Sequence, residues 1–126
     1  MTAEPTAPPA DRHDLLDLAK AAAEAAADRQ ATDVVLLDLQ GTGGFADYFV
    51  ICTGATERQR QAVADAVEAS AATMGAGKVQ REGSASSGWL LLDLGGVIAH
   101  IFAPTDRAFY QLERLWSRAA PVLRIQ

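Results

Sequence analysis

The stretch GWLLLDLGGVIAHIFAP, residues 88–104, decides the fold, because it places a Gly-Gly pair between two apolar runs. A glycine pair between two such runs is a strong signal for a two-residue hairpin turn. We therefore predict two antiparallel strands joined at Gly95 and Gly96, with Leu94 opposite Val97. The same register places Trp89 opposite Phe102, and Pro104 ends the second strand.

This register divides the hairpin into two faces, since side chains alternate along a strand and opposed residues share a face. One face is wholly apolar and is predicted to pack on helices: Leu90, Leu92, Leu94, Val97, Ala99 and Ile101. The other, called here the mixed face, carries Trp89, Leu91, Asp93, Ile98, His100 and Phe102. Its composition suits a partner-binding surface. It equally suits a face that a further helix covers, with His100 as a half-buried structural histidine.

The elements around the hairpin follow from periodicity and turn signals. They are a helix over 11–29, strands over 32–40 and 45–54, a helix over 55–75, a polar edge strand over 78–82 and a helix over 105–120. The order α-β-β-α-β-β-β-α predicts an α/β fold, a single mixed sheet of about five strands with helices packed on it. Residues 11–126 form this single domain, and the proline-rich residues 1–10 are expected to be a disordered tail.

Both later helices carry candidate side chains. Thr56 is expected to cap helix 55–75, with Gln59 completing a capping box and Gly75 ending the helix. The predicted buried stripe of that helix is Ala62, Val63, Ala66, Val67, Ser70 and Met74. At its start, Arg58 and Gln59 are placed to meet an anion or an acidic partner, and Arg60 is expected to be solvated.

In the last helix, Thr105 is the expected N-cap. Phe109, Leu112 and Trp116 form a stripe typical of a core. Tyr110 and Glu113 lie beside that stripe and could reach a partner.

Composition excludes several classes of function. The net charge of −5 and the pI of about 4.8 argue against direct binding of nucleic-acid phosphates and suit a basic protein partner. A single cysteine, Cys52, excludes an internal disulfide and indicates the cytoplasm. His13 and His100 are far apart in the sequence, so we expect no metal and no cofactor. Neither a signal peptide nor a membrane span is visible.

An enzyme remains an alternative, with Asp93 and His100 as an acid and base pair in a small nucleotidyltransferase-like or hydrolytic site. No nucleophile completes a triad, and the glycine-rich loops match no phosphate-binding motif. Gly83 and Ser84 are similar to a nucleotidyltransferase Gly-Ser turn, but the following strand has one carboxylate where a metal-binding D-x-D pair is needed. We favour the interpretation that Asp93 and His100 are polar residues within a binding interface.

Four segments, taken in order, resemble the ribosomal silencing factor (Iojap-related) family. They are DYFVICTG (47–54), RQ with AVADAV (62–67), GWLLLDLGGVIAHIF (88–102) and RAFYQLERLW (107–116), within a match over roughly 15–120. The resemblance implies a nucleotidyltransferase-like fold without that activity. It implies binding to large-subunit ribosomal protein fourteen on the large ribosomal subunit, which blocks small-subunit joining and represses translation when nutrients are short. It also implies a homodimer when free.

The chain departs from the family pattern at Gly96 and Arg118, where the family usually has aspartate. It also has Thr56 where a serine is common.

The function expected from these observations is therefore steric, not enzymatic. The mixed face is predicted to dock on the basic ribosomal protein. The expected rim or supporting residues are Asp47, Tyr48, Arg58, Gln59, Tyr110 and Glu113. A third class is a dimerisation module in which the mixed face pairs with itself, so that a dimer is a resting state that dissociates before docking.

Overall fold

The computed structural model describes residues 12–42, 46–115 and 120–125. The predicted tail over residues 1–10 lies outside this range. The secondary-structure elements of the described residues, in chain order, are α1 (Arg12–Asp28), β1 (Thr32–Asp38), β2 (Tyr48–Thr53), α2 (Glu57–Thr73), β3 (Gln80–Ser84), the 3₁₀ turn η1 (Ala85–Ser87), β4 (Trp89–Asp93), β5 (Val97–Phe102), α3 (Pro104–Tyr110), α4 (Leu112–Leu115) and β6 (Ala120–Ile125). Among these described residues, no helix is long and apolar enough to cross a membrane.

The strands form one mixed sheet in the order β3-β4-β5-β2-β1-β6, which confirms the predicted α/β class. The predicted hairpin register is also confirmed, since Trp89 pairs with Phe102 and Asp93 pairs with Ile98. β2 and β5 run parallel, and the other paired strands run antiparallel. The two hairpin strands therefore lie between the edge strand β3 and the central strand β2.

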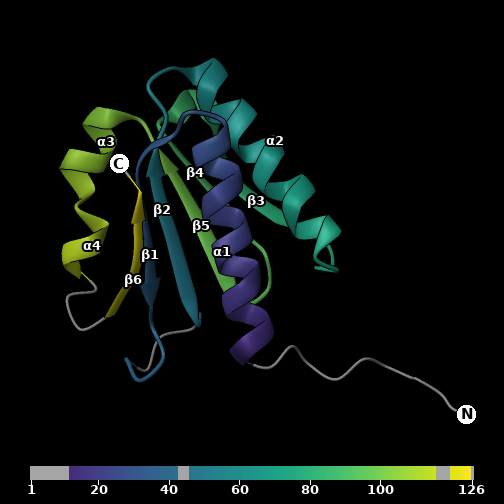
Figure 1. Ribbon diagram of the computed structural model, residues 1–126. Coiled ribbons are helices and arrows are strands. Elements are labelled where there is room, and N and C mark those ends of the chain that lie inside the picture. Colours follow the sequence, from purple (N-terminus) through teal and green to yellow (C-terminus); the bar gives the residue numbers. More distant parts are fainter. Residues whose placement is uncertain (1–11, 43–45, 116–119, 126) are drawn as a thin grey trace, which may run out of the picture.

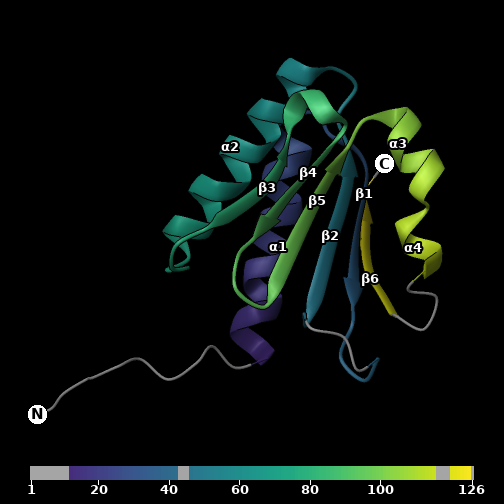
Figure 2. The same ribbon diagram turned by 180° about the vertical axis from the view of Figure 1, so that it is seen from behind.

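Helices lie on both sides of the sheet, with α1 and α2 on one side and α3 and α4 on the other (Figures 1 and 2). The wholly apolar face of the hairpin packs against α1 and α2, as predicted. Four alanines of α1 are fully buried there: Ala19, Ala22, Ala23 and Ala26. Their small side chains let α1 lie close to both α2 and the sheet.

The C-terminal part of the chain differs from the prediction. The helix expected over 105–120 begins at Pro104 and stops at Gln111, whose φ of 47° is left-handed. Its N-cap is Ala103, which has no capping side chain, so the predicted cap at Thr105 was wrong. A sixth strand, β6, follows and pairs with β1 at the sheet edge.

The break at Gln111 also changes which side chains are buried. Phe109 is 79% exposed, so its placement in a core stripe was wrong, whereas Leu112 is buried as expected. Trp116 and Arg118 lie outside the described residues.

The cap of α2 agrees with the prediction, because the Thr56 hydroxyl accepts a hydrogen bond from the Gln59 backbone N–H at 3.0 Å. Gln59 Oε1 accepts from the backbone N–H of Ala55 at 2.7 Å, which is one residue before the expected capping-box partner. The buried stripe is rotated from the predicted one: it consists of Arg60, Val63, Ala64, Val67 and Ala71, and Ala62 and Met74 are exposed.

Arg60 is buried, so the expectation of a solvated side chain was wrong. Its Nε donates to the carbonyl of Ala85 and its Nη1 to the carbonyl of Gly54, both at 2.8 Å. A guanidinium can be buried when backbone carbonyls satisfy its donors. Arg60 thereby ties the loop after β2 to η1.

Candidate functional site

The mixed face of the hairpin is covered unevenly, which corrects the expectation of one open face. Ile98, His100 and Phe102 on β5 are buried, because α3, α4 and the β2 side chains pack around them. Trp89 and Leu91 on the neighbouring β4 are half-buried, and Asp93 is exposed. The covering helices reach β4 at Trp89, through Tyr110, but leave the rest of this face over β4 and β3 open.

Aromatic rings run from the interior of this face to the surface. The rings of Phe49 and His100 meet edge to face with centroids 4.5 Å apart, and Trp89 lies 4.9 Å from Phe102. Trp89 also packs on Tyr110 of α3 at 4.6 Å.

The outer end of this array is Phe109, whose ring meets that of Tyr110 at 5.0 Å. We call the outward residues Trp89, Leu91, Phe109 and Tyr110 the aromatic patch. Phe109 was missed as a site residue because its exposure depends on the helix break at Gln111.

His100 holds the indole of Trp89. Trp89 Nε1–H donates a hydrogen bond to His100 Nδ1 at 3.2 Å, so the imidazole proton lies on Nε2. Burial lowers the pKa of His100 to about 4, because the charged form would lose its hydration. Among the described residues, no hydrogen-bond partner of Nε2 is present. The neutral histidine is thus a fixed acceptor for the indole near neutral pH.

Asp93 has a different role from the acid or base considered above. Its Oδ1 accepts a hydrogen bond from the backbone N–H of Gly95 at 2.9 Å, which closes the hairpin turn. His100 is engaged with Trp89, so the two groups are held by separate partners. This geometry favours structural roles over an acid and base pair. Within the described ranges, no cluster of three His, Cys, Asp or Glu residues could hold a metal ion.

Several predicted rim residues lie away from the mixed face. Tyr48 is buried in the core against α1, on the opposite side of the sheet. Gln59 donates to the carbonyls of Arg29 and Gln30 and so links α2 to the end of α1.

Two further rim residues are also separated from the patch. Asp47 is half-buried beside the hairpin turn, where its N–H donates to the carbonyl of Gly96 at 2.8 Å. Arg58 is exposed on the first turn of α2. Neither position is part of the aromatic patch.

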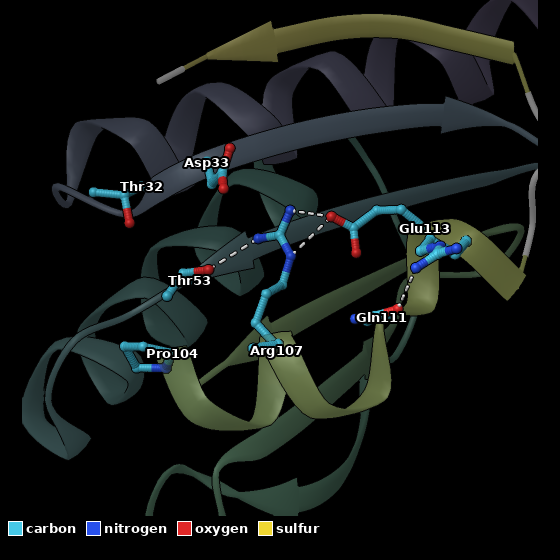
Figure 3. A pocket seen from close by; sticks show the side chains of 9 residues that line it. Thr32, Asp33, Thr53, Pro104, Arg107, Gln111 and Glu113 are labelled. Atoms are coloured by element: carbon cyan, nitrogen blue, oxygen red, sulfur yellow. Dashed lines mark hydrogen bonds and ion pairs between the residues drawn. The ribbon is translucent and has the colours of Figure 1, made fainter.

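Glu113 lies at a joint under α3, where Arg107 was not anticipated. The buried guanidinium of Arg107 donates from Nη2 to Glu113 Oε2 at 2.6 Å and from Nη1 to Thr53 Oγ1 at 2.9 Å (Figure 3). The hollow beside it has a volume of about 570 Å³ and is also lined by Thr32, Asp33 and Pro104. Nε, Nη1 and Nη2 of Arg107 all donate within the protein, so Arg107 acts as a structural joint between α3, α4 and β2.

The chain matches one family model, "Ribosomal silencing factor during starvation", over residues 12–126. Similar proteins include the Ribosomal silencing factor RsfS of Bacillus subtilis, which is 40% identical over 100 residues, covering 79% of this chain and 85% of the relative. The chloroplastic protein Iojap of Zea mays is 32% identical over 122 residues, covering 94% of this chain and 52% of that protein.

Solved structures agree with the fold. A crystal structure of a Chromobacterium violaceum protein superposes with a TM-score of 0.77 at 30% identity, covering 88% of this chain and 92% of that one. A Bacillus halodurans crystal structure gives 0.71 at 36% identity, covering 89% of this chain and 99% of that one.

Proposed function

The chain belongs to the RsfS family of ribosomal silencing factors, and on this premise we propose how it acts. It binds the large ribosomal subunit through large-subunit ribosomal protein fourteen. Its bulk then blocks joining of the small subunit, so that translation falls when nutrients are short. The action is steric and takes place in the cytoplasm.

The observation that carries this proposal is the aromatic patch. Phe109 is 79% exposed and packs on Tyr110, which is 41% exposed and packs in turn on the half-buried Trp89. Tryptophan and tyrosine are enriched among the residues that dominate binding energy at interfaces. A preformed cluster of rings loses little conformational freedom on docking, which favours affinity.

The charge around the patch supports a basic partner. Glu82 and Asp93 are exposed on the two strands nearest its open edge, and Asp106 lies half-buried in α3. The whole chain carries a net charge of −5. Acidic groups around an apolar centre raise the association rate with a basic surface, while the apolar centre supplies the affinity.

The test is binding to purified large ribosomal subunits by co-sedimentation. We expect Trp89→Ala to weaken docking by more than about 1 kcal/mol, because the anchor ring is lost. Circular dichroism of the same variant checks that the fold survives. Since Trp89 also contacts buried rings, Tyr110→Ala serves as a second variant at a more exposed position.

Met74→Ala is the matched control, because Met74 is an exposed apolar residue at the end of α2 on the other side of the sheet. It should bind as the wild type does. Full binding by both Trp89→Ala and Tyr110→Ala would contradict the assignment of the aromatic patch as the docking surface. No binding by the wild type would sink the proposed function itself.

A further inference from the structure

A groove opens beside the aromatic patch at the free edge of the sheet. It has a volume of about 270 Å³ and is lined by Glu82, Gly83, Trp89 and Leu91. The strand register explains why these residues line one groove. Glu82 on β3 is directly opposite Leu91 on β4, and Trp89 lies two residues before Leu91 on the same face of the sheet. Gly83 has a φ of +77°, a conformation that other residues rarely adopt, so this wall carries no side chain.

The groove combines two apolar walls with one carboxylate. Arg81, next to Glu82 in the chain, points to the opposite face of the sheet. There it forms ion pairs with Asp65 at 2.9 Å and with Glu68 at 2.8 Å on α2. The nearest arginine in the sequence is therefore engaged elsewhere and does not neutralise Glu82, which remains exposed.

We propose that this groove binds an arginine side chain of the docking partner. The aliphatic stem of an arginine packs on Leu91, and its planar guanidinium stacks on the indole of Trp89. The same guanidinium donates to the Glu82 carboxylate with the fork geometry that a carboxylate accepts. An acidic side chain is repelled here by Glu82, and a purely aliphatic one leaves the carboxylate without a partner. The inference rests on the proposed docking through the aromatic patch.

The first experiment probes the groove without ribosomes. N-acetyl-arginine amide is titrated into the full chain and followed by the Trp89 indole and Leu91 methyl NMR signals. We expect weak, saturable shifts, and we expect them to be absent with N-acetyl-citrulline amide, which has the same length and no charge. The Glu82→Gln variant should lose the response to the arginine probe. Equal shifts with both probes, unchanged shifts in Glu82→Gln, or no shift at all overturn the proposal.

The second experiment measures binding to large ribosomal subunits at two salt concentrations. Glu82→Gln is expected to weaken binding by about 5-fold at low salt, and by less at high salt, because a charged pair at the rim of an interface is lost. Glu24→Gln is the matched control, since it makes the same change in net charge at an exposed position on α1. Glu82→Asp should retain part of the affinity.

The two failures are distinguishable. If the wild type does not bind large subunits, the proposed function fails, and the titration with N-acetyl-arginine amide still tests whether the groove binds an arginine side chain. If the wild type binds and Glu82→Gln behaves like Glu24→Gln, the groove inference fails and the docking surface stands.

Discussion

His100 illustrates how the surroundings of one side chain decide its role. Its imidazole is 3% exposed, with Phe49 on one side and Trp89 Nε1–H donating to it. A neutral, correctly protonated imidazole is needed to accept that hydrogen bond. We therefore interpret His100 as a positioning residue that sets the orientation of Trp89 in the aromatic patch.

This role predicts coupling between His100 and Trp89 in docking. His100→Leu should weaken large-subunit binding by about 3-fold to 10-fold, because the indole loses an acceptor worth roughly 1 kcal/mol. In a Trp89→Phe background, which has no indole N–H, the His100→Leu change should weaken large-subunit binding little further. Equal costs in the two backgrounds would contradict the positioning role. The NMR shift of the Trp89 indole proton should change in His100→Leu before any partner is added.

Burial of His100 also predicts a pH dependence of stability. The pKa of His100 is about 4 in the folded chain and 6.5 for an ordinary histidine, the value expected in the unfolded chain. Between pH 4 and pH 6.5 the unfolded chain therefore binds more protons than the folded chain. The contribution of buried, neutral His100 to the unfolding free energy is fully present above about pH 6.5 and is lost as the pH falls towards 4. Between pH 7 and pH 5 the wild type should lose about 2 kcal/mol more unfolding free energy than His100→Leu. Urea unfolding of both proteins at the two pH values measures this difference, and parallel losses would refute it.

At the scale of elements, α3 and α4 decide how much of the mixed face is open. Arg107 in α3 connects β2, through Thr53, with α4, through Glu113. The guanidinium holds the pKa of Glu113 below its usual value against the opposing effect of burial, so the carboxylate is charged at neutral pH. The short helices are thereby fixed on the sheet with Tyr110 against Trp89.

This joint predicts an unequal cost for two ion pairs. Glu113→Gln should destabilise the fold by roughly 1–3 kcal/mol, because it leaves the buried Arg107 guanidinium without its charged acceptor. Arg81→Ala, which removes the partly exposed pairs with Asp65 and Glu68, should cost at most about 1 kcal/mol. Thermal unfolding of the two variants makes the comparison. A larger effect of Arg81→Ala would show that the joint under α3 contributes less than its burial indicates.

At the scale of the whole molecule, the sheet is covered well on one side and partly on the other (Figures 1 and 2). The face against α1 and α2 is buried, while the second face leaves Trp89 of β4 half-buried and Phe109 and Tyr110 of α3 exposed. An exposed cluster of this kind can dock on a partner or on a second copy of the chain. The same patch therefore links the expected free homodimer to ribosome binding.

We predict that the free chain forms a homodimer through the aromatic patch and that docking requires the monomer. Light scattering at two concentrations should show a mass that rises with concentration. Phe109→Asp should shift the protein to the monomer, because a charge is placed in the contact, and Met74→Asp should leave the mass unchanged. Addition of large subunits should compete with self-association.

A cross-linked dimer tests the order of these events. Phe109→Cys offers a reactive thiol at the patch, whereas the native Cys52 is buried and its pKa is raised to about 12, so it stays unreactive. The locked dimer is expected to leave subunit joining unaffected. A locked dimer that still blocks joining would rule out dissociation before docking.

The sequence alone determined the features that depend on neighbours along the chain. The hairpin turn, the pairing of Trp89 with Phe102 and the Thr56 cap were all predicted, because alternation and turn chemistry are local. The polar edge strand β3 was predicted for the same reason, and it lies at the end of the sheet. The mixed composition of one hairpin face also pointed to the region where the aromatic patch lies.

Only the tertiary structure decided which parts of that face are covered and which side chains it recruits. The burial of Arg60 and Arg107 depends on carbonyls and acceptors supplied by distant segments, so no local pattern predicted it. β6 was missed because it contains Pro121, which an edge strand tolerates since one of its sides makes no ladder hydrogen bonds. The exposure of Phe109 and the burial of His100 follow from where α3 stops and packs. Local pairing rules therefore set the two faces, and long-range packing selected the part of one face that remains open to a partner.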